Sequence, residues 1–229
     1  MKPILLLLLL CLPVCSPGAD QPPVILVVGD SLSSGYGIDT EQGWVQLLDK
    51  RLQSRSCRFR VVNLSISGET TRAAIAVLEP ALPKYRPAIV IIGLGGNDGL
   101  RGISLGEMRN NLEHLVSSAR DKGARVLLLG MRLPPNYGSY YAGKFHEVYQ
   151  QVAAEQQVPL VPFFLAGVAE DRLLMQEDNI HPNAGAQPIL LDTLWPYLEP
   201  LLAPEATPGD PAPPVSLPGC PMSEASELP

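Results

Sequence analysis

The chain has 229 residues, a formal net charge of −6 at pH 7 and a pI near 5.1, and 46% of its residues are hydrophobic. Its 17 lysine and arginine residues form no cluster, which excludes the usual electrostatic footprint of a nucleic-acid-binding protein. Residues 19–202 are long enough for one domain with a complete hydrophobic core.

Residues 1–18 are typical of a secretory signal peptide. Lys2 precedes the apolar run Ile4–Leu12, and small residues follow up to Gly18. The run is too short to cross a bilayer, so we expect no stable membrane span. The segment therefore predicts export to the periplasm or secretion. Lipoprotein anchoring at Cys15 is a minor alternative, because the residue before it is not small.

Five apolar runs predict β-strands: Val24–Val28, Phe59–Leu64, Ala88–Leu94, Arg125–Gly130 and Val158–Phe163. Apolar residues that recur every three or four positions predict helices around Trp44–Leu52, Met108–Ala119 and Tyr141–Val152, and a last helix over Ala184–Leu202. Strands that alternate with helices favour right-handed crossovers and a parallel sheet covered on both faces. The predicted fold is a three-layer α/β/α sandwich with five parallel strands in flavodoxin-like order.

Residues 203–229 predict a disordered tail, because they contain eight prolines, no aromatic residue and few aliphatic ones. Without the signal peptide, the cysteines of the chain are Cys57 and Cys220. An oxidising compartment would allow these two to pair, but Cys220 belongs to the tail. The sequence implies no disulfide framework, and their pairing stays open.

The first predicted strand ends abruptly in Gly29-Asp30-Ser31. A buried strand that stops there presents a hydroxyl at the carboxyl edge of the sheet, where open α/β folds bind their ligands. Ser31 is a candidate nucleophile, but a helix N-cap is an equally good interpretation. The pattern is not the G-x-S-x-G of the nucleophile elbow, because Ser33 replaces the second glycine.

A nucleophilic serine needs a base, and the chain has three histidines. His114 points away from the apolar stripe of its helix and is predicted to be a surface residue. His146 flanks the stripe of its own helix, has no acid at a triad-like spacing and is predicted to be structural. His181 follows the last strand, three residues after Asp178. That spacing in a turn lets the carboxylate contact Nδ1 and leaves Nε2 as the base. Taken alone, however, the spacing favours an incidental pair in a loop.

An acyl-transfer site also needs donors for an oxyanion. The backbone N–H groups of Ser31 and Gly68, and the side-chain amide of Asn97, are the candidates at the ends of the first three strands. Gly68 alone would be read as a turn glycine, and Asn97 as an Asx turn. The combination of all these residues at strand ends favours a catalytic interpretation over separate structural ones.

The sequence resembles the SGNH hydrolases, or GDSL esterases, over residues 24–202. Four blocks of that family occur in order: Gly29–Leu32, the glycine of Asn63–Gly68, Gly95–Asp98 and Asp178–His181. Within the family it is similar to the bacterial periplasmic thioesterase–lysophospholipase type, on the stretches Gly95–Gly102, Met131–Gly138 and His181–Pro188. The proline-rich tail departs from that type.

The resemblance implies the SGNH fold and a serine esterase that needs no metal or cofactor. Ser31 would be the nucleophile, His181 the base and Asp178 the acid that orients it, with Ser31, Gly68 and Asn97 forming the oxyanion hole. The implied substrates are small-molecule carboxylic esters and thioesters of acyl chains, lysophospholipids among them. Acyl-CoA is cytosolic, so an exported enzyme would meet lysophospholipids or other esters instead.

We expect the protein to be a monomer. Two alternatives to the esterase function remain at this point. A carbohydrate O-deacetylase or an arylesterase can be built on the same scaffold. A flavodoxin-like module that binds a phosphate-bearing ligand without catalysis is disfavoured, because the first loop carries Asp30 and no lysine or arginine lies between Asp30 and Lys50.

Overall fold

The computed structural model describes residues 22–203, so the predicted signal peptide, residues 1–18, and all but the first residue of the predicted tail lie outside the described residues. Five strands form one parallel sheet: β1 (Val24–Gly29), β2 (Arg60–Asn63), β3 (Ile89–Gly93), β4 (Arg125–Leu129) and β5 (Leu160–Val161). Their order is β2-β1-β3-β4-β5. The predicted parallel sheet and flavodoxin-like order are confirmed.

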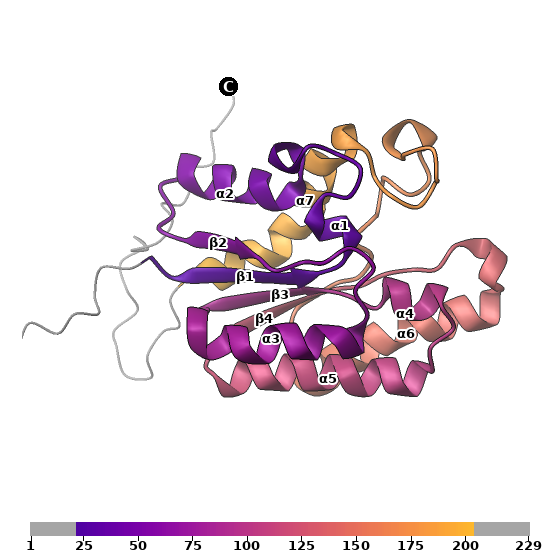
Figure 1. Cartoon of the computed structure of the whole chain (residues 1–229), viewed down its shortest axis with the longest axis horizontal. Helices are drawn as coiled ribbons and strands as arrows, with labels where there is room; N and C mark the ends of the chain where they lie inside the picture. Colours follow the sequence, from indigo (N-terminus) through magenta and orange to yellow (C-terminus); the bar gives the residue numbers. More distant parts are fainter. Residues whose placement is uncertain (1–21, 204–229) are drawn as a thin grey trace, which may run out of the picture.

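Seven α-helices accompany these strands in the described part of the chain: α1 (Ser31–Ser34), α2 (Trp44–Ser54), α3 (Thr71–Tyr85), α4 (Gly96–Leu100), α5 (Leu105–Asp121), α6 (Ser139–Gln156) and α7 (Gln187–Leu198). Figure 1 shows α2 and α7 on one face of the sheet and α3, α5 and α6 on the other. The helices pack pairwise as α2 with α7, α3 with α5, and α5 with α6. This arrangement is the predicted three-layer sandwich.

The sheet centre is apolar because helices cover both of its faces. Every residue of β1 is buried, and β3 is buried up to its last residue. Each fully buried aliphatic side chain contributes about 1.5–3 kcal/mol relative to exposure. The edge strand β5 is shorter than predicted, since Pro159 and Pro162 flank it and neither can donate a ladder hydrogen bond.

The last predicted helix is divided into three pieces. A 3₁₀ turn, Ala184–Ala186, leads into α7, and a second 3₁₀ turn, Glu199–Leu202, follows it. Pro188 lies in the first turn of α7, where its missing N–H removes no intrahelical hydrogen bond. The helix continues past Pro196 and ends at Leu198.

The carboxyl ends of the strands carry the segments that the sequence singled out. Helix α1 follows β1, the loop with Gly68 follows β2, helix α4 follows β3, and the loop with His181 follows β5. Figure 1 shows α1, α4 and the loop before α7 at the same edge of the sheet. Between residues 22 and 203, no helix is long and apolar enough to cross a membrane.

Candidate active site

Ser31 is the first residue of α1, directly after β1. Asp30, not Ser31, is the N-cap, because its Oδ1 accepts a hydrogen bond of 3.1 Å from the backbone N–H of Leu32. The N-cap interpretation of Ser31 is therefore wrong, and its hydroxyl is free for another role. The helix ends after one turn, since Gly35 adopts a left-handed conformation with φ of 77°. The side chain of Asn63 donates to the carbonyl of Ser33 at 2.7 Å and holds this turn in place.

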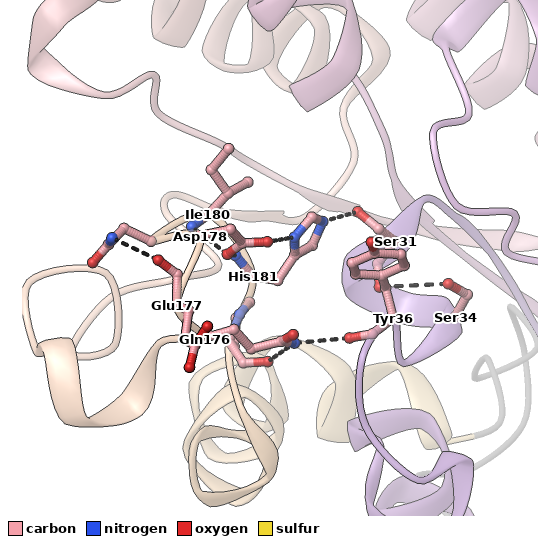
Figure 2. Close-up of polar contacts among 10 residues, drawn as sticks. Ser31, Ser34, Tyr36, Gln176, Glu177, Asp178, Ile180 and His181 are labelled. Carbon is pink, nitrogen blue, oxygen red and sulfur yellow. Dashed lines mark hydrogen bonds and ion pairs between the residues drawn. The ribbon is translucent and has the colours of Figure 1, made fainter.

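Asp178 and His181 lie in one loop that is built around the carboxylate (Figure 2). Oδ1 of Asp178 accepts hydrogen bonds from the backbone N–H groups of Ile180, at 2.9 Å, and His181, at 3.0 Å. Its Oδ2 lies 2.6 Å from Nδ1 of His181. The predicted turn therefore does bring the carboxylate to the imidazole.

The ionisation of Asp178 follows from these contacts. Burial acts to raise the pKa of its carboxyl, but the hydrogen bonds from the His181 side chain and from the N–H groups of His181 and Ile180 outweigh it and lower the pKa to about 2. Asp178 is therefore ionised at neutral pH and accepts hydrogen bonds only. Nδ1 of a neutral His181 must then carry the proton, which leaves the lone pair on Nε2.

Nε2 of His181 lies 2.9 Å from Oγ of Ser31, and Figure 2 shows the hydrogen bonds running from Asp178 through the imidazole to the serine. The two residues are 150 positions apart in the sequence. With Nε2 as acceptor, the Ser31 hydroxyl is the donor of this bond. The arrangement can remove a proton from Ser31 as its oxygen attacks an electrophile.

The other two histidines lie away from this group. His114 is exposed on α5 and its Nε2 pairs with Glu79 at 3.0 Å. His146 on α6 is half-buried, and its Nδ1 lies 3.2 Å from the carbonyl of Met131. Both placements agree with the predicted surface and structural roles.

Two backbone N–H groups are candidates for binding an oxyanion. Among residues 22–203, the N–H groups of Ser31 and Gly68 have no hydrogen-bond acceptor. Gly68 has φ of 81°, a conformation that a side chain would strain. The carbonyl of Gly68 accepts a hydrogen bond of 2.9 Å from a guanidinium N–H of Arg101. The hydroxyl of Ser67 forms a hydrogen bond of 2.8 Å with the hydroxyl of Ser34 on α1. These contacts hold the Gly68 loop beside the nucleophile.

Asn97, on α4, directs its amide toward the same region but already has two acceptors. Its Nδ2 lies 3.0 Å from the carbonyl of Glu69 and 3.3 Å from Oδ2 of Asp30. Both amide hydrogens are thus used. Donation to an oxyanion would exchange one of these bonds, and the longer one, to Asp30, is the weaker.

Asp30 has a second role that the sequence reasoning missed. Its carboxylate is 4% exposed and faces Asn97. Burial raises the pKa of Asp30 to about 6, even though the Leu32 N–H, the charge of His181 and the Asn97 amide act to lower it. Because Asp30 accepts from Asn97, it orients that amide. The signal that could have found it is a carboxylate placed directly after a buried strand.

Two further residues that the sequence reasoning missed hold α4. The carboxylate of Asp98 is fully buried and accepts from the backbone N–H of Thr71, at 2.9 Å, and from its hydroxyl, at 2.5 Å. The hydroxyl of Tyr149, on α6, donates to the carbonyl of Leu94 at 2.8 Å. Gly95 has φ of 103°, and a Cβ there would lie 2.4 Å from that hydroxyl. These contacts fix the turn that presents Asn97.

A cavity of about 620 Å³ opens at Ser31, Asn97 and His181. Its other walls are mainly apolar and include Leu100, Met131, Leu133, Phe163, Leu165, Met175 and Ile180. The size and lining suit the acyl part of a small molecule. In the described part of the chain, no three His, Cys, Asp or Glu side chains are grouped so that they could hold a metal ion.

A comparison with family models matches residues 27–187 to the GDSL-like Lipase/Acylhydrolase family. These residues begin in β1 and end at the start of α7, so the match includes all the segments that form the site.

Individual proteins are similar over nearly their whole length. Esterase TesA of Pseudomonas aeruginosa is 52% identical over 178 residues, which are 78% of this chain and 89% of that protein. Thioesterase 1/protease 1/lysophospholipase L1 of Escherichia coli K12 is 39% identical over 184 residues, 80% of this chain and 87% of that protein. A crystal structure of the psychrotrophic esterase EstA from Pseudoalteromonas, inhibited by monoethylphosphonate, superposes with a TM-score of 0.75. Its sequence is 37% identical, and the match covers 78% of this chain and 98% of that one.

Proposed function

The chain belongs to the GDSL-like Lipase/Acylhydrolase family, the SGNH hydrolases, and on that premise we propose that it is a serine esterase that cleaves acyl esters and thioesters through an acyl-enzyme on Ser31. The observation that carries this proposal is the unbroken hydrogen-bond path from Asp178 through His181 to Ser31, which ends in an apolar cavity. Esterase, thioesterase and lysophospholipase activities are those of its relatives.

In the first half of the reaction, Oγ of Ser31 attacks the acyl carbonyl carbon while Nε2 of His181 takes the hydroxyl proton. The carboxylate of Asp178, 2.6 Å from Nδ1, stabilises the imidazolium that forms. The carbonyl oxygen becomes an oxyanion, to which the N–H groups of Ser31 and Gly68 and the Asn97 amide are the available donors. Nε2–H then protonates the leaving alcohol or thiol as the tetrahedral intermediate collapses.

In the second half, water attacks the acyl-enzyme by the same route in reverse. His181 takes a proton from the water, the oxyanion forms again at the same donors, and Nε2–H returns a proton to Ser31 as the acid departs. Only the oxygen that becomes negatively charged is recognised by these donors, so esters and thioesters with different leaving groups can share the site.

Within this activity we infer that zwitterionic lysophospholipids are substrates. Besides the buried Asp30, two charged side chains, Arg132 and Glu170, line the cavity. In the described part of the chain neither of these two forms an ion pair. The guanidinium of Arg132 lies 5.0 Å from the centre of the Phe163 ring, which holds it at the wall. An acyl chain in the apolar part, with a phosphate near Arg132 and an ammonium near Glu170, matches this distribution of charge.

We also propose that the protein is exported, on the signal-peptide pattern of residues 1–18. Export would separate the enzyme from cytosolic acyl-CoA and bring it to the lipids of the cell envelope. Fractionation of cells that express the full chain, with N-terminal sequencing of the mature protein, tests this part. A protein found in the cytosol with Met1 or Lys2 at its N-terminus would contradict it.

The test of the nucleophile uses Ser31→Ala. We expect kcat on a p-nitrophenyl ester to fall by several orders of magnitude, on the order of 10⁶, with the fold retained. A fluorophosphonate probe should label the unaltered protein and not the variant, while His114→Ala should keep both activity and labelling. A folded Ser31→Ala protein with near-normal activity would remove the proposal.

The test of the substrate compares two esters of the same acyl chain. Arg132→Gln should raise KM for a lysophosphatidylcholine several-fold, because the phosphate loses its cation, and leave KM for the p-nitrophenyl ester nearly unchanged. Equal effects on both esters would contradict the headgroup assignment. Acyl chains from acetyl to hexadecanoyl complete the comparison, and a sharp preference for acetyl would favour the carbohydrate O-deacetylase alternative.

A further inference from the structure

The contact between Ser31 and His181 joins two loops that share few other interactions. Ser31 belongs to the turn after β1, which we define as residues 30–37, and His181 to the loop of residues 174–183. In the described part of the chain, two hydrogen bonds connect these segments. One is the Ser31–His181 bond itself, and the other is donated by the side chain of Gln176 to the carbonyl of Tyr36.

The amide of Gln176 is placed to hold both segments at once. Nε2 donates to the carbonyl of Tyr36 at 2.8 Å and to the carbonyl of Pro182 at 3.0 Å, so both of its hydrogens are used. The backbone N–H of Gln176 donates to the carbonyl of His181 at 2.7 Å. Gln176 therefore fixes the carbonyls of His181 and Pro182. Figure 2 shows its side-chain bond to the carbonyl of Tyr36.

The residue that Gln176 holds also covers the base. The ring of Tyr36 lies 4.6 Å from the imidazole of His181, centre to centre, at a tilt of 43°. The next residue, Gly37, packs against the amide so closely that a Cβ there would lie 2.1 Å from Oε1 of Gln176. The position of the imidazole is thus set from the acid side by Asp178 and from the nucleophile side by the pair of Tyr36 and Gln176.

We propose that Gln176 is a positioning residue that sets the distance between His181 and Ser31. This inference rests on the proposed function, which makes His181 the base. The side chain of Gln176 is absent from the walls of the cavity, so it acts on the reaction through the backbone of the two segments. A proton transfer in the transition state is sensitive to such placement, and a displacement of about 1 Å can cost on the order of 100-fold in rate.

Gln176→Met tests the proposal, because methionine keeps the length and volume of the side chain and removes both amide donors. We expect kcat to fall by about ten- to a hundredfold and KM to stay within about twofold. Labelling by a fluorophosphonate should slow by the same factor as kcat, since it uses the same serine and base. The melting temperature should change by only a few degrees, because this side chain is not fully buried.

The matched control is Gln53→Met, which alters an exposed glutamine on α2. In the described residues its side chain bonds only to Asp49, so the change should leave kcat and labelling unchanged. Gln176→Glu is a second variant, since an ionised carboxylate cannot donate to either carbonyl, and it should lower kcat at least as far. A kcat within twofold of the unaltered protein in both variants overturns the proposal, as does a loss explained by unfolded protein in circular dichroism. If Ser31→Ala and His181→Ala also retained activity, the proposed function itself would fail instead.

Discussion

At the scale of single residues, the amide of Asn97 has two acceptors before any substrate binds. It bonds to the carbonyl of Glu69 and to the carboxylate of Asp30. These bonds fix its direction without closing the site, because the one to Asp30 is long at 3.3 Å and can be exchanged for a shorter bond to an oxyanion. A donor that is oriented in advance needs no reorganisation at the moment of reaction.

Asn97→Ala tests this role. Loss of one such donor typically costs about 10²–10³ in kcat, or about 3–4 kcal/mol of transition-state stabilisation. KM should change little, since the bond is strongest with the developing oxyanion. The fluorophosphonate probe should still label Ser31, though more slowly. A kcat within a few-fold of the unaltered protein, together with a lower melting temperature, would reduce Asn97 to a turn residue.

At the scale of elements, α4 is a helix of five residues that is held by buried contacts rather than by its own length. Isolated helices this short are unstable in water. Asp98 joins it to the start of α3, and Tyr149 joins the turn before it to α6. The direction of the Asn97 side chain therefore depends on two helices on the same side of the sheet.

Asp98→Ala should show this dependence. It leaves the N–H and hydroxyl of Thr71 without their buried acceptor, which should cost about 2–4 kcal/mol of the free energy of unfolding. It should also lower kcat in the protein that remains folded. The control is Glu107→Ala, which removes an exposed carboxylate that pairs with Arg72 of α3 and should cost less than about 1 kcal/mol. Urea unfolding of the two variants distinguishes them, and equal losses would contradict the role of burial.

The elements that could be predicted are those whose signal is local. Strands buried on both faces are continuous apolar runs, so β1, β3 and β4 were evident from the sequence. Helices α1 and α4 are too short for any periodicity, and α3 contains Pro80 and Pro83, which hide its pattern. In the same way, the Asp178–His181 pair follows from a spacing of three residues. The hydrogen bonds of Asp98 to Thr71 and of Gln176 to Tyr36 join segments that are far apart in the sequence. No local sequence pattern predicts such bonds.

At the scale of the whole molecule, two carboxylates of the site oppose each other in their effect on stability. The pKa of Asp178 is lowered to about 2 from an ordinary value of 3.8, so its contribution is present above about pH 4 and is lost as the pH falls toward 2. The pKa of Asp30 is raised from 3.8 to about 6, so the folded protein holds its proton more tightly than the unfolded chain does. Its effect is to lower stability as the pH rises from about 4 to about 6, with no further change above that.

Asp30→Asn should remove this second dependence. A difference of about 2 pH units in pKa corresponds to roughly 2–3 kcal/mol of stability lost by the unaltered protein between pH 4 and 7. The free energy of unfolding of the variant should not show this decrease between pH 4 and 7, whatever its value at any single pH. Urea unfolding of both proteins across pH 4–8 measures it, and the quantity of interest is the difference between the two pH curves. Parallel curves would mean that Asp30 titrates alike in the folded and unfolded states.

The separation of 150 positions between Ser31 and His181 also has a consequence for the way in which the protein is made. A ribosome synthesises the nucleophile 150 positions before the base, and α7, which packs against α2, emerges later still. A nascent chain that is still being synthesised or threaded across a membrane holds a serine without a base. If the proposed export takes place before folding, the chain crosses the cytosol, where acyl-CoA thioesters are found, with Ser31 and His181 still apart. Hydrolysis then begins only after the two segments that carry Ser31 and His181 have come together in the folded protein.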